Sequence, residues 1–403
     1  MSDPKNRMLG GLLDLGRLAA FDELPKLVAE HAAEVGLDQV RLYVADLRGV
    51  VLREVTGRGL DAGQDGQEFG VDSSLPGRAF RDVRTLTSRT PEADGRLVYW
   101  APVLDGTERL GVLRAIPVPG DDAGQTALRE LAALVGLLLV SKRAASDSHA
   151  RLVRSQPMTI AAEMQWQLMP PTSFANQHVV IAAAMEPAYE VGGDAFDYAI
   201  AGDTVHAAVF DAMGHDTAAG LAANLSMAAC RSNRRQNADL ITIGQQIERA
   251  LVEQFDSARY VTAILADLDT RSGLLTWVNY GHHPPVVVRG GRWVSSLPCP
   301  PAHPLGTDLG LSVTLCREQL EPGDRLLLYT DGVTEARDAN GREFGLSRFV
   351  DFVIRHHADG LTVPETLRRL MRALIDHHRG RLQDDATVLF LEWPGPHRAN
   401  TRI

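Results

Sequence analysis

The sequence predicts an α+β protein with a small N-terminal α/β domain, a helical connector, and a C-terminal sandwich of two sheets flanked by helices. Three observations predict this arrangement. The chain has 403 residues, which is long for a single domain. A helical repeat of apolar residues separates two regions that alternate in the manner of strands. In the second region, short strands are separated by glycine turns and interrupted by helices. We expect a segment at 1–19, the small domain at 20–119, the connector at 120–170, the sandwich at 171–395 and a tail at 396–403.

Composition and charge exclude several classes of protein. The chain is 45% hydrophobic and 23% charged, which suits an ordinary globular protein with a sizeable core. Its net charge of −10 argues against a general nucleic-acid binder, because such proteins are usually basic. The three cysteines lack the spacing of a metal finger, and we expect them to be reduced in a cytoplasmic protein. Residues 1–16 lack the pattern of a signal peptide.

The N-terminal domain is predicted to begin with a helix over 25–35. Alternation and turn residues then predict two strands, a short helix and two further strands, at 40–44, 50–55, 74–80, 96–104 and 110–118. This order, with Leu-Pro-Gly-Arg-Ala-Phe at 75–80, resembles the GAF family of small sensory modules. The resemblance implies either a sensor for an unidentified small ligand or a dimerisation scaffold. The domain has no cysteine for attaching a bilin, and we expect His31 on the helix surface rather than at a haem.

The connector is predicted to contain two helices. Leu128, Leu131, Leu134, Val135 and Leu138 recur at helical spacing, and a second helix is expected over 159–168. Such helices can carry a signal and pair two subunits into a homodimer, although a passive spacer remains an alternative. The most apolar run, 131–140, is shorter than the roughly 20 residues that cross a bilayer, so we expect no membrane span.

The sandwich is predicted from strands in hairpins with tight turns between them. The expected strands are 179–184, 195–201, 204–210, 260–267, 274–279, 286–289, 293–296, 312–316, 325–330 and 387–393. The expected helices are 217–235, 240–256, 346–358 and 364–378. Strands and helices in this order predict two stacked sheets with helices outside them.

One hairpin brings two carboxylates together. Gly202 and Asp203 suit a two-residue turn, because glycine tolerates the positive φ that such turns need. In that register Asp194 lies opposite Asp211, with Cβ atoms about 4.5–5.5 Å apart. Two carboxylates at that distance repel each other unless a cation lies between them.

Two further aspartates lie at strand ends. Asp331 follows an apolar strand and precedes a glycine, and Asp384 precedes the last strand. Aspartate beside glycine is also a common turn former, which is the alternative for any one of these residues. Four carboxylates at strand ends suit hard divalent cations, which prefer oxygen ligands.

These segments resemble the SpoIIE/RsbU-type branch of the metal-dependent PPM protein phosphatases over about 160–393. The resemblance lies in the order of several motifs: Ala162-Glu163 with Gln167-Leu168-Met169-Pro170, Glu190 to Asp197, Asp211-Ala212-Met213-Gly214-His215, Tyr260 to Ala263, Gly281 to Pro285, Pro304-Leu305-Gly306, Gly323-Asp324, Tyr329 to Ala336, and Asp384 to Thr387. Asp216 departs from the family, in which glycine is frequent at that place, and this leaves the shape of the loop in doubt.

The resemblance implies an αββα sandwich with two Mn²⁺ or Mg²⁺ ions. Asp194 and Asp211 would contact the metals, with Asp211 bridging and the backbone carbonyl of Ala212 completing one site. Asp331 and Asp384 would hold the other ion, and Asp384 is preferred to Asp385 by analogy with the wider family. The substrate implied is a phosphorylated STAS-domain anti-anti-sigma protein.

Other polar residues near these motifs have less certain roles. His215 could donate a proton to the leaving oxygen, although anchoring of its loop is the expected role. His282 and His283 are expected to be structural at their turn. Arg231, Arg234 and Arg235 could receive a phosphoprotein, although a solvated helix end is the expected reading.

Two rival functions remain. The string Gly192 to Phe196 also resembles the signature of diguanylate cyclases, but Ala195 stands where that signature has glutamate. The second rival is a non-catalytic module that keeps the phosphatase fold and binds a regulator of a sigma factor. The four intact aspartates argue against it.

Overall fold

The structure is a computed structural model that describes residues 3–89, 95–118, 124–190, 192–378, 382 and 384–396. The chain divides into two compact units, Met1–Pro157 and Met158–Ile403. Val191, the first residues of the expected connector and nearly all of the expected tail lie outside the described residues. Each unit has its own core and is described by itself.

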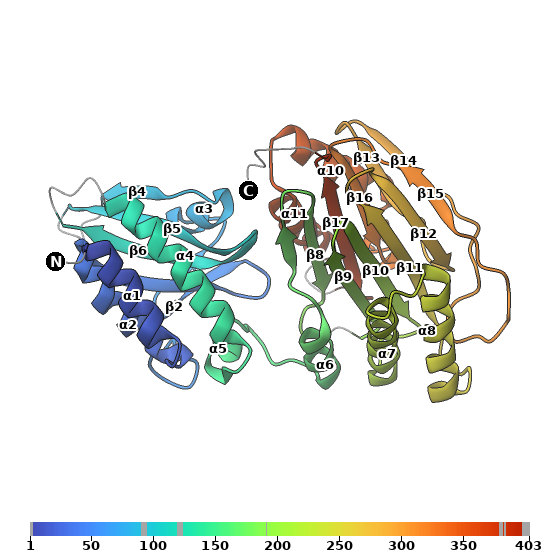
Figure 1. The fold of residues 1–403 in the computed structure, drawn as a ribbon, viewed down its shortest axis with the longest axis horizontal. Coiled ribbons are helices and arrows are strands. Elements are labelled where there is room, and N and C mark those ends of the chain that lie inside the picture. The colour runs from blue at the N-terminus through green and yellow to red at the C-terminus, as the bar shows by residue number, and fades with distance from the viewer. Residues whose placement is uncertain are drawn as a thin grey trace. The chain divides into compact units, whose positions relative to one another are not determined.

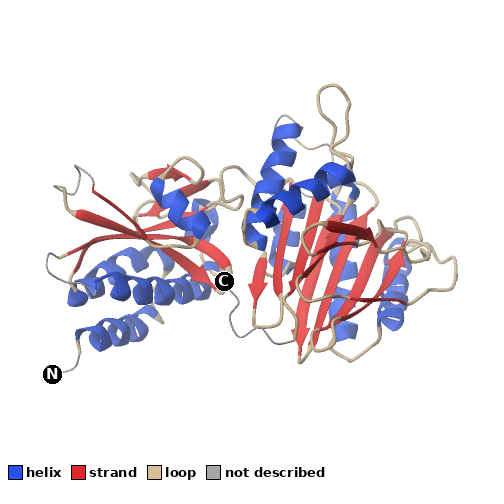
Figure 2. Cartoon of the chain, turned by 90° about the horizontal axis from the view of Figure 1, so that it is seen from above, coloured by secondary structure: helices blue, strands red, loops and turns tan. Residues whose placement is uncertain are grey.

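The N-terminal unit contains one antiparallel sheet with helices on both faces. The strands are β1 (Leu37–Ala45), β2 (Val51–Val55), β3 (Glu68–Gly70), β4 (Leu86–Arg89), β5 (Leu97–Asp105) and β6 (Glu108–Pro117), in the spatial order β3-β2-β1-β6-β5-β4. The helices are α1 (Pro4–Gly16), α2 (Leu24–Ala32), α3 (Leu75–Asp82), α4 (Gly124–Arg143) and α5 (Asp147–Leu152). One core joins α1, α2 and α4 to the sheet, and a second joins α3 to the opposite face (Figure 2).

The strand predictions for this unit are confirmed in order, with ends displaced by a few residues. Sequence analysis did not predict α1, which begins where Asp3 accepts a hydrogen bond from the Lys5 amide and Pro4 opens the first turn. Helix α4 was expected in the connector, but it lies in the core of the N-terminal unit. Leu128, Leu131 and Val135 on α4 are fully buried there.

The apolar run at 131–140 lies within α4, which is 20 residues long and therefore longer than the run itself. Among the described residues, α4 alone has the length and composition of a membrane-spanning helix. More than half of its apolar window, 56%, is buried within the protein, and a core helix of this length passes the same test.

The C-terminal unit is a sandwich of two sheets between two layers of helices (Figures 1 and 2). The first sheet has the order β15-β12-β11-β10-β9 and the second has the order β14-β13-β16-β17-β8-β7. The strands are β7 (Ser173–Ala175), β8 (Val180–Glu186), β9 (Asp194–Ala201), β10 (Thr204–Ala212), β11 (Val261–Asp269), β12 (Leu274–Tyr280), β13 (Val286–Arg289), β14 (Trp293–Ser296), β15 (Cys316–Gln319), β16 (Asp324–Tyr329) and β17 (Ala386–Trp393).

Successive side chains along the central strands point to opposite faces of their sheet, so that each sheet packs on both faces. On β16, Leu326 and Leu328 contribute to the core between the sheets, whereas Leu327 and Tyr329 contribute to the core beneath the outer helices. Helices α7 (Thr217–Arg234) and α8 (Leu240–Phe255) cover the first sheet, and α10 (Leu346–Ala358) and α11 (Val363–His377) cover the second. The expected αββα arrangement is present in this unit, and α6 (Ile160–Leu168) packs against α7.

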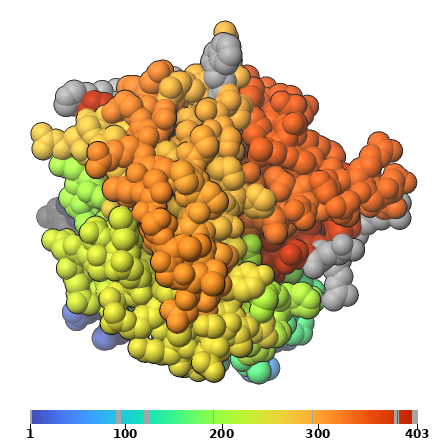
Figure 3. Space-filling model, turned by 90° about the vertical axis from the view of Figure 1, so that its right-hand side faces the viewer, coloured from blue at the N-terminus to red at the C-terminus, as the bar shows by residue number. Residues whose placement is uncertain are grey.

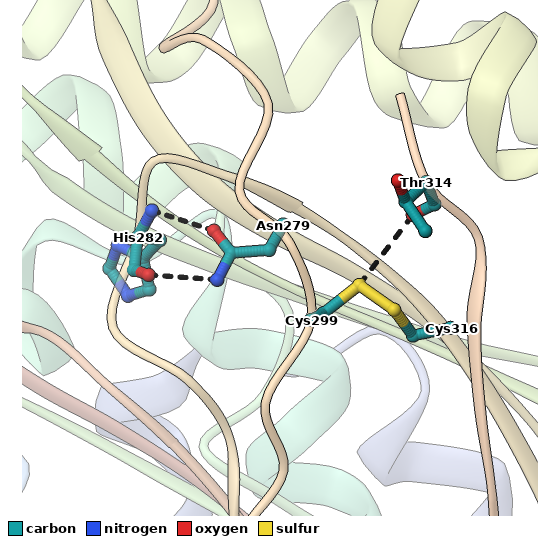
Figure 4. Close-up of a disulfide and its surroundings, with 5 residues drawn as sticks. All are labelled: Asn279, His282, Cys299, Thr314 and Cys316. Carbon is teal, nitrogen blue, oxygen red and sulfur yellow. Dashed lines mark hydrogen bonds between the residues drawn. A yellow bond between two sulfur atoms is a disulfide. The ribbon is translucent and has the colours of Figure 1, made fainter. Parts of the chain in front are cut away.

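Two expectations for this unit are wrong. The strand expected at 312–316 begins at Cys316 instead and pairs with β12. The cysteines are not all reduced, because Cys299 and Cys316 form a disulfide (Figure 4), while Cys230 is free and buried. The disulfide joins the two ends of the segment 299–316, which appears in orange at the surface in Figure 3. Main-chain bonds tie this segment to the first sheet, including a reciprocal pair between Leu305 and Val261.

Candidate metal centre

The hairpin of β9 and β10 has the predicted register. Ala201 pairs with Thr204 across the turn, Gly202 has a φ of +59°, and Asp194 lies directly opposite Asp211. The next strand places Thr262 beside Asp211 on its other side. Local turn chemistry therefore brings these two carboxylates to one end of the first sheet.

Asp194 is buried, with only 2% of its surface exposed. Its Oδ2 accepts a hydrogen bond of 2.7 Å from the Thr330 hydroxyl. Burial raises the pKa of Asp194 well above its usual value, and the charges of Asp211 and Asp385 raise it further, while the hydrogen bond from Thr330 opposes the shift. A carboxylate in such a place is costly to ionise unless a cation compensates it.

The pKa of Asp211 reflects the charges of other carboxylates near it. Its pKa is raised to about 7, first by burial and then by the charges of Asp331, Asp384 and Asp385. All three residues adjoin strands of the second sheet: Asp331 follows β16, and Asp384 and Asp385 precede β17. Asp331 and Asp384 therefore lie close enough to the hairpin of Asp194 and Asp211 for their charges to act on Asp211.

Asp384 and Asp385 differ in their surroundings. Asp385 is 5% exposed, and its Oδ2 accepts hydrogen bonds from the amides of Gly192 at 2.8 Å, Gly193 at 2.6 Å and Asp194 at 3.3 Å. Asp384 is exposed, and its Oδ1 accepts a bond from the Asp385 amide. The pKa of Asp384 is raised by partial burial and by Asp331. Asp385 is thus committed to the loop before β9, whereas Asp384 has an oxygen available for a ligand.

This difference predicts opposite results for two matched substitutions. Asp384→Asn should lower the metal-dependent phosphatase activity that the family resemblance implies at least a hundredfold, because it removes a charged donor from the expected ligand set. Asp385→Asn should keep most of the activity, since an amide oxygen can still accept from the three backbone amides. Steady-state rates at saturating Mn²⁺ compare the two variants. Equal losses in both would contradict the division of roles.

The loop between β10 and α7 is anchored at both ends. Arg259 donates to the Met213 carbonyl at 3.0 Å and to Asp216 at 2.6 Å. Asp216 also accepts from the Ala219 amide and so caps α7, and these bonds lower its pKa. Aspartate in place of the family's frequent glycine therefore gives the loop a defined shape. His215 lies exposed on this loop, near enough to Asp384 to interact with it electrostatically.

Gly193 must be small where it passes this loop. A Cβ atom there would lie 2.5 Å from the carbonyl oxygens of both Ala212 and Gly214. The Gly193 carbonyl in turn accepts from the Ala212 amide at 3.0 Å. The backbone carbonyl of Ala212 is thus held beside the two opposed aspartates.

His282 is structural, as predicted. It is buried, its ring contacts the Thr262 hydroxyl at 2.7 Å and the Tyr329 carbonyl at 2.9 Å, and Asn279 bonds its main chain (Figure 4). Burial lowers its pKa to about 4, so the ring is neutral near pH 7. The ring therefore links the first sheet to the end of β16.

Sequence reasoning missed two residues beside Asp331. Potential ligand atoms of His283, Asp331 and Glu335 lie within 4.8 Å of one another. The His283 ring is stacked on Tyr329, with centroids 5.8 Å apart. Glu335 follows Asp331 by one turn, across the short helix α9 (Asp331–Thr334), and that spacing was the available signal. His283 was expected to be structural, but it can contribute an imidazole donor here.

The arginine cluster at the end of α7 has a role that neither interpretation of the sequence predicted. Arg231 and Arg234 both bond Asp197, which is 1% exposed, at distances of 2.6–2.9 Å. These ion pairs connect α7 to β9, so two of the three arginines are neither a solvated helix end nor free to receive a phosphoprotein. Arg235 is exposed.

The donor set fits divalent metal ions. It offers carboxylate oxygens from Asp194, Asp211, Asp331 and Asp384 and the carbonyl of Ala212, and hard cations prefer such ligands. The pKa values of the buried members are raised partly by one another, and a bound cation would relieve that repulsion.

The C-terminal part of the chain is similar to a known protein family and to two named proteins. Residues 201–394 match the family model described as Stage II sporulation protein E (SpoIIE). Phosphoserine phosphatase RsbU of Bacillus subtilis is 24% identical over 238 residues, 58% of this chain and 68% of that protein. Protein IcfG of Synechocystis sp. is 29% identical over 142 residues, 34% of this chain and 21% of that protein. The chain thus spans about a fifth of the length of one relative and about two thirds of the other.

Two solved structures are similar to the chain. One is the structure of the RsbU and RsbW domains of Rv1364c from Mycobacterium tuberculosis, with 24% identity and a TM-score of 0.49, covering 57% of this chain and 64% of that one. The other is the SiaA-PP2C domain of Pseudomonas aeruginosa, with 22% identity and a TM-score of 0.48, covering 58% and 94%.

The family match and the αββα fold define the C-terminal unit as a metal-dependent phosphatase domain of the PPM class. Within that class, it is of the SpoIIE/RsbU type.

Proposed function

We propose that this protein is a Mn²⁺- or Mg²⁺-dependent phosphatase that removes phosphate from serine or threonine of a STAS-domain anti-anti-sigma protein. The observation that carries the proposal is the convergence of Asp194 and Asp211 from one sheet with Asp331 and Asp384 from the other. The substrate class follows from the similarity to phosphoserine phosphatase RsbU. In a partner-switching pathway of this kind, the dephosphorylated protein would capture an anti-sigma kinase in the cytoplasm.

The roles proposed for this chain's own residues are those that the family resemblance implies. Asp194, Asp211 and the carbonyl of Ala212 would hold one ion, with Asp211 shared, and Asp331 and Asp384 would hold the other. When bound, two such ions supply Lewis-acid activation of water and of the phosphoryl group. Asp385 holds the loop of Gly192 and Gly193 against the site. His215, exposed near Asp384, can deliver a proton to the leaving serine oxygen.

The direct test is phosphate release from purified phospho-STAS proteins, with Mn²⁺ and with EDTA. We expect release by the full-length protein only when Mn²⁺ or Mg²⁺ is present. A second arm with p-nitrophenyl phosphate separates loss of substrate recognition from loss of chemistry. Metal-dependent binding of a STAS protein without turnover of either compound would replace this proposal with a non-catalytic binding module. Cyclic dinucleotide formed from GTP would instead support the cyclase reading.

Metal binding should also stabilise the C-terminal unit. A ligand at 100 times its Kd adds about 2.7 kcal/mol to the free energy of unfolding. For a domain of this size, that corresponds to a rise in Tm of about 5–10 °C. Differential scanning fluorimetry of the full-length chain, with Mn²⁺ and with EDTA, measures this change in Tm. An unchanged Tm at millimolar Mn²⁺ would count against a metal centre.

We further propose that the N-terminal unit is a GAF-like sensor that alters the rate through α6. On α6, the side chain of Gln165 donates to the carbonyls of Gly192 at 3.2 Å and Asp194 at 2.8 Å. A displacement of α6 would therefore reach the loop that carries Asp194. A variant starting at Thr159 should differ in kcat from the full-length protein. Identical rates under all conditions would remove the support for a sensor.

A homodimer through the N-terminal unit is also proposed. On and after α1, the side chains of Leu13, Leu15 and Leu18 are 55%, 54% and 84% exposed. Large apolar side chains that are exposed to this extent can take part in an interaction surface. Light scattering of the full-length chain, beside a variant with all three changed to serine, measures the oligomeric state.

A further inference from the structure

We propose that Thr330 is a positioning residue that orients the Asp194 carboxylate toward the metal centre and couples it to the pairing of β16 with β17. This inference rests on the metal ligands assigned in the proposed function. It concerns a side chain that is not itself among those ligands.

The hydrogen bonds of the Thr330 hydroxyl can have only one direction. Its Oγ1 lies 2.9 Å from the Thr387 amide and 2.7 Å from Oδ2 of Asp194. An amide N–H can only donate, so the hydroxyl accepts from Thr387. Its single proton is then available for Asp194, and an ionised carboxylate can only accept. The chain of bonds runs from the Thr387 amide through Thr330 to Asp194.

This direction determines which oxygen of Asp194 is available. Oδ2 is occupied by the bond from Thr330, which leaves Oδ1 as the free oxygen of that carboxylate. The main chain of Asp194 is held separately, since its carbonyl accepts from Gln165 and its amide donates to Asp385. Backbone and side chain are thus constrained by different partners, and the side-chain rotation depends on Thr330.

Thr330 also joins the two halves of the proposed centre. Asp194 belongs to β9 in the first sheet, while Thr330 follows β16 in the second. The Thr330 amide donates to the Thr387 carbonyl at 3.0 Å, so the main chain at Thr330 is fixed to β17. The next residue is Asp331. The same residue therefore sets the backbone position of one proposed ligand and the side-chain orientation of another.

The arrangement is shielded from water. Thr330 and Thr387 are fully buried and Asp194 is 2% exposed. In such surroundings a hydrogen bond to a carboxylate is stronger than at the surface, and water does not replace a hydroxyl that is removed. Partners of this kind around a metal ligand typically change metal affinity by 10- to 100-fold when they are lost.

A graded series at this position tests the proposal. Thr330→Ser keeps the hydroxyl, Thr330→Cys replaces it with a weaker donor, and Thr330→Val removes it with little change in size. Thr366→Val is the matched control, because Thr366 is equally buried but its hydroxyl bonds the carbonyl of Thr362, the N-cap residue of α11. Electron paramagnetic resonance of free Mn²⁺ measures the Kd of the full-length proteins without reference to activity.

We expect the serine variant to bind Mn²⁺ with the wild-type Kd, the valine variant at least tenfold more weakly, and the cysteine variant between them. The Thr366 variant should have a lower Tm and an unchanged Kd. If the valine variant does not fold, the comparison of serine with cysteine decides, and equal affinities there would overturn the proposal. A wild-type Kd for folded Thr330→Val would also overturn it. Absence of Mn²⁺ binding by the wild-type protein would instead reject the proposed metal centre itself.

Discussion

Asp211→Asn should abolish metal-dependent phosphate release while leaving the protein folded. Asp211 faces Asp194 across the hairpin and also lies within the electrostatic reach of Asp331 and Asp384. Asp211 is therefore a proposed ligand whose charge interacts with carboxylates next to the second sheet while it pairs with Asp194 in the first. Loss of a shared ligand removes several kcal/mol of transition-state stabilisation, which corresponds to about a thousandfold in rate. Asp203→Asn, at the exposed turn of the same hairpin, is the matched control and should retain full activity.

The same variant should be more stable than the wild type when metal is absent. The pKa of Asp211 is raised to about 7 in the folded protein, above its usual value of 3.8. A raised carboxyl pKa means that the folded state holds its proton more tightly, so stability is lost as the pH rises from about 4 toward and through about 7. Asparagine cannot ionise and avoids that loss. In EDTA at pH 8, Asp211→Asn should have a higher Tm than the wild type, and added Mn²⁺ should reduce or reverse the difference.

Two results would contradict this account. Near-wild-type turnover by Asp211→Asn would reject the assignment of the metal ligands. A lower Tm in EDTA at pH 8, together with lost activity, would indicate that the substitution disrupts the fold. The rate would then carry no information about ligands.

The hairpin was predictable because its cause is local. Gly202 and Asp203 determine the turn, the turn determines the register, and the register places Asp194 opposite Asp211. The long amphipathic helices α10 and α11 were predicted within a residue at each end for the same reason. By contrast, the meeting of Asp331 and Asp384 with that hairpin depends on how two sheets stack. Sequence analysis inferred it from strand ends and family resemblance, and in the structure the charges of Asp331 and Asp384 raise the pKa of Asp211.

Other features could not be deduced because they join distant parts of the chain. Three cysteines allow three single pairings, and spacing does not choose Cys299 with Cys316. The apolar face of α4 could be predicted from the sequence, but the sheet that it covers could not. Thr330 was quoted only as part of a motif, because its role requires Asp194 to lie 136 residues away in sequence and 2.7 Å away in space.

Asp197→Ala should cause the largest loss of stability among the substitutions considered. Asp197 is 1% exposed and accepts three hydrogen bonds, two from Arg231 and one from Arg234. Removing one partner of a buried ion pair leaves the other charges without compensation, at a cost of about 3–5 kcal/mol. The lower end applies here, because Arg231 and Arg234 keep 20% and 10% of their side chains exposed and can reach some water. About 3 kcal/mol corresponds to a fall in Tm of roughly 6–12 °C.

The arginines of α7 provide a matched comparison for the same interaction. Arg231→Ala removes two of the bonds to Asp197, whereas Arg235→Ala changes an exposed residue one turn further along the chain. The first should destabilise the protein clearly but less than Asp197→Ala, since Arg234 still compensates the buried carboxylate. The second should lie within about 0.5 kcal/mol of wild type, as exposed substitutions usually do. Urea unfolding of all three variants measures these differences. Equal effects of Arg231→Ala and Arg235→Ala on stability would show that the ion pairs do not hold α7 to β9. Phosphoprotein binding by these arginines would then be the hypothesis to test.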